Sequence, residues 1–63
     1  MDVQFRNHGS IWLAQPLTAA AGDWIAEHIP EDAQYWGDAV VIEPRYVAAI
    51  AEGMANGGLE VGQ

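Results

Sequence analysis

Residues 33–54, AQYWGDAVVIEPRYVAAIAEGM, contain the two periodicities from which the fold is expected to be built. Residues 33–36 and 39–42 are expected to form the two strands of a hairpin around Gly37-Asp38, because glycine at the first central position favours a type II′ turn. After this hairpin, apolar side chains recur at i, i+3, i+4 and i+7, which is the spacing of one helical face. These are Val47, Ile50, Ala51 and Met54.

The second helix is expected to begin near Glu43-Pro44, because proline is well placed at the first helical position. It is expected to end at Asn56-Gly57-Gly58, where glycine adopts the left-handed cap conformation. Residues 59–61 then predict a short final strand with Glu60 pointing outward.

Upstream, residues 9–15 are rich in strand formers and end before Pro16. Residues 1–8 are expected to fray, with a small hairpin around Asn7-His8-Gly9 as the alternative. Thr18 is a good N-cap for the first helix, and Pro30 stops that helix. Its apolar face comprises Leu17, Ala20, Ala21, Trp24, Ile25 and His28.

The resulting order is β-α-β-β-α-β, which predicts an α+β fold. We expect two amphipathic helices on one face of a small, three- to four-stranded, mainly antiparallel sheet. A ferredoxin-like arrangement is one candidate, and the strand order is left open. Residues 1–63 are expected to form a single compact domain.

Charge is the strongest functional signal, because nine acidic residues face two arginines and no lysine, for a net charge of −7. Such a surface repels nucleic acid and anionic membranes and attracts basic proteins. The absence of cysteine excludes disulfides and thiol catalysis, and favours a reducing cytoplasm. We recognise no signal peptide and no apolar run long enough to cross a bilayer.

Candidate catalytic and metal-binding residues are few. His28 and Glu31 are three residues apart, with Glu27 beside them, but Pro30 interrupts the helix and His8 is distant in sequence. Ser10 lies two residues from His8 without a nucleophile-elbow motif. We therefore expect no enzyme, no metal and no cofactor, and keep a minimal metal-dependent enzyme as a weaker hypothesis.

Aromatic residues have two interpretations, a filled core or a docking patch; the residues concerned are Trp12, Tyr35, Trp36 and Tyr46. Trp24 is expected in the core. Trp12 alternates with Ile11 and Leu13, so either both sheet faces are covered or Trp12 is exposed. An exposed apolar sheet face would favour a homodimer, and we expect a monomer or a weak homodimer.

Four segments carry a resemblance to known proteins: HGSIWL at 8–13, PLT at 16–18, EHIPEDAQ at 27–34 and VIEPRYV at 41–47. Together they resemble a group of very small bacterial and phage-borne proteins. The characterised members that this chain is similar to are small acidic anti-CRISPR proteins of phages and mobile elements that act on the type I-C system. The resemblance implies a protein of the host bacterial cytoplasm that binds the crRNA-guided surveillance complex.

The function that the resemblance implies is inhibition by imitation of duplex DNA, in which carboxylates replace phosphates and block the groove that reads the protospacer-adjacent motif. Exposure and clustering, rather than a family motif, select the contact residues: Asp23, Glu27, Glu31, Asp32 and Asp38, with Glu43 and Glu52 as further candidates. The partner would be a basic nucleic-acid-binding protein. The alternatives are a solubilising surface, or an acidic dimerisation or antitoxin-like module without a CRISPR role.

Overall fold

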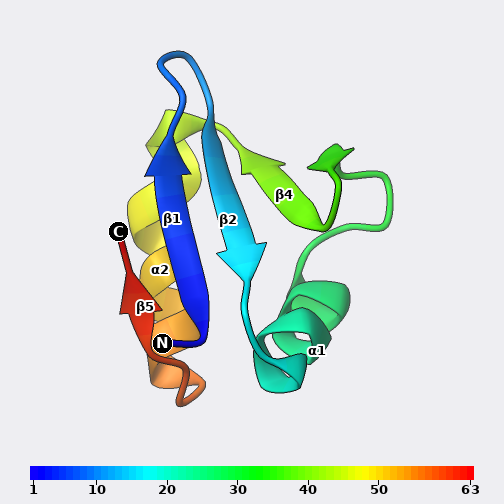
Figure 1. The fold of residues 1–63 in the computed structure, drawn as a ribbon, viewed down its shortest axis with the longest axis vertical. Coiled ribbons are helices and arrows are strands. Elements are labelled where there is room, and N and C mark those ends of the chain that lie inside the picture. The colour runs from blue at the N-terminus through cyan, green and yellow to red at the C-terminus, as the bar shows by residue number, and fades with distance from the viewer.

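Five strands and two α-helices make up the fold in the computed structural model, which describes residues 1–63 (Figure 1). In chain order the elements are β1 (Val3–Asn7), β2 (Trp12–Pro16), α1 (Ala19–His28), β3 (Tyr35–Trp36), β4 (Ala39–Ile42), the 3-10 helix η1 (Pro44–Tyr46), α2 (Val47–Asn56) and β5 (Val61–Gly62). The α+β class that the sequence predicts is therefore confirmed.

The sheet is mixed, with strand order β3-β4-β2-β1-β5. Strand β5 lies parallel to β1, whereas every other neighbouring pair is antiparallel. The prediction of three to four strands is wrong, because the sheet has five and the element order has an additional strand at its start.

The error lies in residues 1–16, where the sequence favours fraying of residues 1–8 and a strand over 9–15. The alternative hairpin around Asn7-His8-Gly9 is the one that forms, with Asn7 opposite Trp12, and its second strand runs over 12–16 and includes Pro16. Residues 3–7 instead form β1, which lies between β2 and β5 and is paired on both sides. Val3 and Phe5 point into the core and are almost completely buried. Burying such side chains contributes about 1.5–3 kcal/mol each, which outweighs the fraying of a chain terminus.

Both helices cover the same face of the sheet, as the sequence predicts. The core cluster joins sheet residues from β1, β2 and β4 with Ala21 and Ile25 of α1 and Met54 of α2. Met54 has no exposed surface, so the apolar periodicity of residues 47–54 identifies the buried face of α2 correctly. Figure 1 shows α2 behind β1 and β5, with α1 near the end of β2.

The ends of helix α1 follow the expected chemistry. Thr18 is the N-cap, and its Oγ1 accepts a hydrogen bond from the Ala21 N–H at 3.2 Å. The helix ends at His28, with Ile29 as an extended C-cap immediately before Pro30. Pro44 starts a 3-10 turn rather than α2 itself, which begins three residues later at Val47.

Trp24 of α1 packs against α2 and explains Gly53 within that helix and Gly57 at its C-cap. A Cβ added to Gly53 would lie 3.3 Å from the Trp24 ring, and one added to Gly57 would lie 3.1 Å from its Nε1. The close approach of the indole therefore favours glycine at both positions. Trp24 is half-buried and packs against the core, so its expected core role is confirmed.

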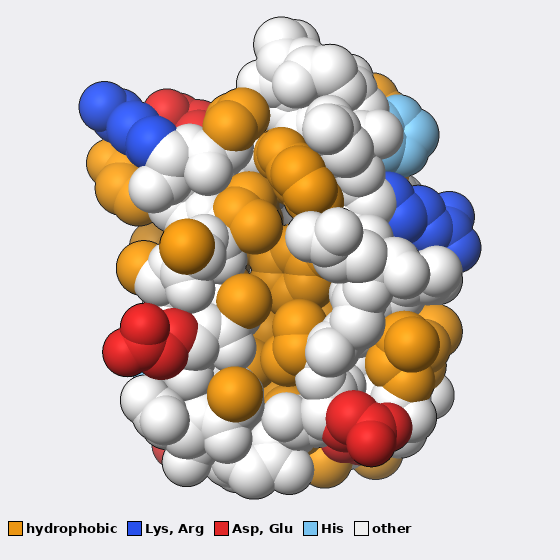
Figure 2. Space-filling view, turned by 90° about the vertical axis from the view of Figure 1, so that its left-hand side faces the viewer, with side chains coloured by type: hydrophobic (Ala, Val, Ile, Leu, Met, Phe, Trp, Pro, Cys, Tyr) orange, Lys and Arg blue, Asp and Glu red, His pale blue; other side chains and the backbone are white.

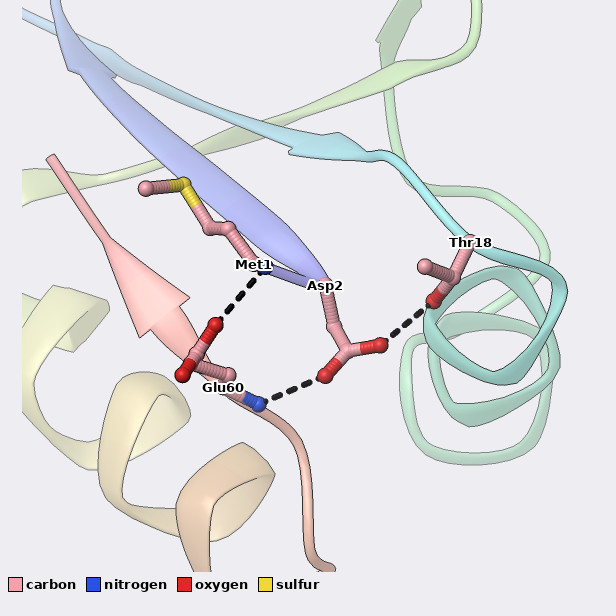
Figure 3. A network of polar contacts seen from close by, with 4 residues as sticks. All are labelled: Met1, Asp2, Thr18 and Glu60. Atoms are coloured by element: carbon pink, nitrogen blue, oxygen red, sulfur yellow. Dashed lines mark hydrogen bonds and ion pairs between the residues drawn. The ribbon is translucent and has the colours of Figure 1, made fainter.

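Asp2 joins the three places where β1, α1 and β5 begin (Figure 3). One carboxylate oxygen accepts from the Thr18 hydroxyl and the other from the Glu60 N–H, both at 2.8 Å. The Glu60 backbone N–H, and then the Thr18 hydroxyl, lower the pKa of Asp2. The Met1 ammonium lies 2.7 Å from the Glu60 carboxylate, and this contact raises the pKa of the ammonium.

Candidate functional site

The acidic residues on and just after α1 form the largest group of candidate contact residues that lie near one another in the sequence. Asp23 and Glu27 are both exposed and stand four residues apart, which places neighbouring Cβ atoms about 5–6 Å apart on a helix. Glu31 and Asp32 follow within the turn Pro30–Ala33, which the Ala33 N–H closes on the Pro30 carbonyl at 3.0 Å. We call residues 30–33 the acidic turn.

The other three candidates lie on other elements. Asp38 is in the β3–β4 turn, where its Oδ1 accepts a hydrogen bond from Gln15 Nε2 at 2.8 Å. Glu43 follows β4 and forms an ion pair with Arg45 at 3.1 Å. Glu52 is exposed on α2. The structure therefore groups Asp23, Glu27 and the acidic turn along one segment, but not all seven residues on a single element.

Figure 2 shows the side of the molecule on which α2 and β5 lie. A hollow with hydrophobic side chains runs down the middle of this face, and the acidic side chains stand apart from one another around it. The carboxylates on this side do not form a continuous strip.

Most of the carboxylates have no cation beside them. The ion pairs are Met1–Glu60 and Arg45–Glu43, so two of the nine acids are paired and the remaining seven are not. Arg6, the other arginine, donates a hydrogen bond to the Gln4 side chain at 3.4 Å instead. Asp2 and Asp38 accept hydrogen bonds within the chain, so the carboxylates left available to an outside partner are those of Asp23, Glu27, Glu31, Asp32 and Glu52.

An apolar pocket lies at the C-terminal end of α1, next to the acidic turn. Its volume is about 190 Å³, and seven of its nine lining residues are hydrophobic. The lining residues are Ile29, Pro30, Ala33, Val40, Val41, Ile42, Glu43, Tyr46 and Ile50. The sequence does not reveal this pocket, because its walls come from three segments that only the sheet topology brings together.

One signal in the sequence pointed toward the pocket. Ile29, the residue just after α1, and Ile42, the last residue of β4, are large apolar residues that line the pocket. Acidic residues follow each of them in the sequence, Glu31 and Asp32 after the first and Glu43 after the second.

The histidines are used within the fold. His28 stacks on Trp24 with ring centroids 4.2 Å apart, and its Nδ1 lies 2.9 Å from the Trp24 carbonyl oxygen. His8 contacts the edge of the Trp36 ring, with centroids 5.7 Å apart. Neither histidine approaches Ser10 or Glu31 through a hydrogen bond, and the structure places no three His, Asp or Glu side chains as a group able to hold a metal ion.

The four aromatic residues considered for a docking patch differ in exposure. Trp12 is half-buried and packs against the core. Leu13, on the opposite face of the sheet, is only 6% exposed, so both faces are covered at this point of β2. Tyr35, Trp36 and Tyr46 remain 42%, 49% and 48% exposed, respectively.

Comparisons with known proteins add no family to these observations: no protein-family model, curated protein or solved structure matches this chain. Neither of the two helices has the length and apolar character that a membrane span requires.

Proposed function

We propose that this protein is a non-enzymatic anti-CRISPR inhibitor that binds the crRNA-guided surveillance complex of the type I-C system. Its carboxylates take the place of DNA phosphates in the basic groove that reads the protospacer-adjacent motif, and so exclude duplex DNA. The contact residues are Asp23, Glu27 and the acidic turn, with Asp38, Glu43 and Glu52 as further candidates.

The observation that supports this proposal best is the surplus of unpaired negative charge. Seven of nine carboxylates lack a cationic partner, although a chain that needed only solubility would gain stability by interspersing lysines. Asp23 and Glu27 also repel each other on neighbouring turns of α1, which costs the isolated fold a few tenths of a kcal/mol. A basic groove would convert that repulsion into attraction.

The mechanism is electrostatic competition. A DNA duplex presents one negative charge per ~1.7 Å of its axis, and carboxylates one helical turn apart are spaced like neighbouring phosphates of one strand, to within a few ångströms. The partner's arginines and lysines would neutralise these carboxylates as they neutralise DNA phosphates, so binding should weaken as salt is raised. Inhibition requires binding alone, without bond making or breaking.

The direct test is competition for the purified type I-C surveillance complex with a fluorescent duplex that carries its protospacer-adjacent motif. We expect the protein to displace the duplex, and the variant E31K/D32K to fold normally but to displace it at least about tenfold less well. Simultaneous binding of protein and duplex to the complex would contradict the proposed mechanism.

A second function is favoured by the exposed Tyr35 and Trp36 on the edge strand β3. Aromatic side chains left 42% and 49% exposed are typical of a surface that another protein covers. The alternative is therefore a small acidic module that dimerises or binds another basic protein without a CRISPR role. Light scattering in increasing salt distinguishes a homodimer from the electrostatic inhibitor, because dimerisation through apolar side chains is nearly independent of salt.

A further inference from the structure

We propose that the apolar pocket receives one large apolar side chain of the basic partner, and that arginine or lysine residues on either side of it meet the acidic turn and Glu43. This inference rests on the proposed binding of a basic protein and deepens it, since it names the feature by which that protein is recognised. The occupant is a basic protein segment with a single apolar anchor.

The size of the pocket matches one side chain. An engineered apolar cavity of roughly 150 Å³ binds a benzene molecule, and this pocket holds about 190 Å³. A leucine, an isoleucine or one aromatic ring would therefore fill it. Ile29, Ala33 and Ile50 line the pocket and are only partly buried, so they supply apolar contacts for such a group.

The charges around the pocket determine which residues of the partner can lie beside its apolar anchor. Pro30 and Ala33, the first and last residues of the acidic turn, line the pocket, and Glu31 and Asp32 are the exposed residues between them. Glu43, which carries the third carboxylate, is itself one of the lining residues.

The only base at this site is Arg45, which already pairs with Glu43 and lies 4.9 Å from the Tyr46 ring. Three carboxylates and one guanidinium leave two net negative charges around an apolar pocket (−3 + 1 = −2). An acidic or purely apolar segment would leave these carboxylates facing a like charge or no charge. A segment with cations beside its apolar anchor neutralises them, so charge complementarity identifies a basic partner.

Anchor and charges have separable effects. Side chains that fill a pocket at the centre of an interface dominate affinity, whereas charges at its rim govern association rate and salt dependence. We therefore expect part of the binding energy to persist when salt weakens the electrostatic part.

The test uses two short arginine-rich peptides that differ only at one central position, leucine in one and alanine in the other. Because the leucine side chain buries three more carbons, it should bind the unmodified protein about tenfold or more tightly by fluorescence anisotropy. Added salt should weaken the binding of both peptides and leave the ratio of their dissociation constants unchanged.

The variant A33L fills the pocket, since Ala33 lines it and packs against the core. It should bind both peptides equally. The matched control A26L makes the same change on the exposed side of α1 and should keep the preference for leucine. Persistence of that preference in a folded A33L would overturn the proposal, as would equal binding of the two peptides by the unmodified protein.

A second measurement needs no variant. Ile29, Ile42 and Ile50 line the pocket, whereas the other isoleucines, Ile11 and Ile25, do not. Titration with the leucine peptide should shift the δ1-methyl NMR signals of the first three and leave Ile11 unchanged. Shifts of the same signals on raising the protein concentration alone would assign the pocket to a second copy and overturn the proposal.

The outcomes also distinguish this inference from the proposed function. Salt-sensitive binding of both peptides without a preference for leucine would support a basic partner and reject the apolar anchor. Failure of both peptides to bind at low salt would contradict the basic partner and the anchor together. Pocket-dependent binding of the leucine peptide without displacement of DNA from the type I-C complex would retain the anchor and reject the CRISPR target.

Discussion

At the scale of single residues, Asp2 connects parts of the chain that are far apart in sequence. Its carboxylate accepts hydrogen bonds from Thr18 and Glu60 and thereby holds the first helix and the last strand against β1. The charge pattern alone would place Asp2 among the surplus acids available to a partner. Its role is structural instead, and nothing in the sequence near residue 2 reveals the distant Glu60.

The lowered pKa of Asp2 predicts a loss of stability in acid. The folded pKa lies below the ordinary value of 3.8, so this contribution is complete above that value and is lost as the pH falls through the folded pKa. We expect D2N to melt at a lower temperature than the unmodified protein at neutral pH, and the two to converge toward acid pH. Melting curves followed by circular dichroism measure this, and a difference that stayed constant with pH would contradict it.

Substitution of Thr18 should have a simpler effect on stability. T18A removes the N-cap acceptor and one of the two donors to Asp2, and loss of such a cap costs about 0.5–2 kcal/mol. For a chain of this size, each kcal/mol lowers the melting temperature by roughly 4–8 °C. T18S keeps the hydroxyl and should retain most of the stability, so equal losses in T18A and T18S would rule out the cap as the cause.

At the scale of elements, the helices were easier to predict than the strands. Thr18, Pro30 and the apolar spacing of residues 47–54 act within one or two turns, so the sequence shows them directly. Strand β1 depends on two partners, one of which is at the other end of the chain, and its place in the sheet could not be predicted from residues 1–8. The same non-local assembly creates the apolar pocket.

Gly22 and Gly53 provide a matched test of helix packing. Each lies inside a helix, where replacement by alanine gains about 1 kcal/mol if nothing obstructs the added methyl group. Nothing lies within 4 Å of a Cβ at Gly22, whereas Trp24 lies 3.3 Å from one at Gly53. We expect G22A to gain about 1 kcal/mol in the free energy of unfolding by urea, and G53A to gain clearly less or to lose stability. Equal gains would show that the indole does not constrain α2.

At the scale of the whole molecule, charge and fold are largely independent. The core contains no buried polar or charged residue, and the acids sit on the surface around it. The net charge is plain from the sequence, but its distribution over α1, the acidic turn, the two ends of β4 and α2 follows from the topology. Substitutions that move charge should therefore change binding while the fold persists.

We infer that the position of the carboxylates on the fold, rather than their number, determines binding. The double variants E31Q/D32N and A49K/A55K both change the net charge from −7 to −5 (−7 + 2 = −5), the first at the acidic turn and the second at exposed positions of α2. The most direct measurement is the affinity of each for the type I-C surveillance complex between about 50 and 200 mM salt. We predict that E31Q/D32N binds about tenfold more weakly and with a shallower salt dependence, while A49K/A55K stays close to the unmodified protein. Equal losses in the two variants would contradict the account.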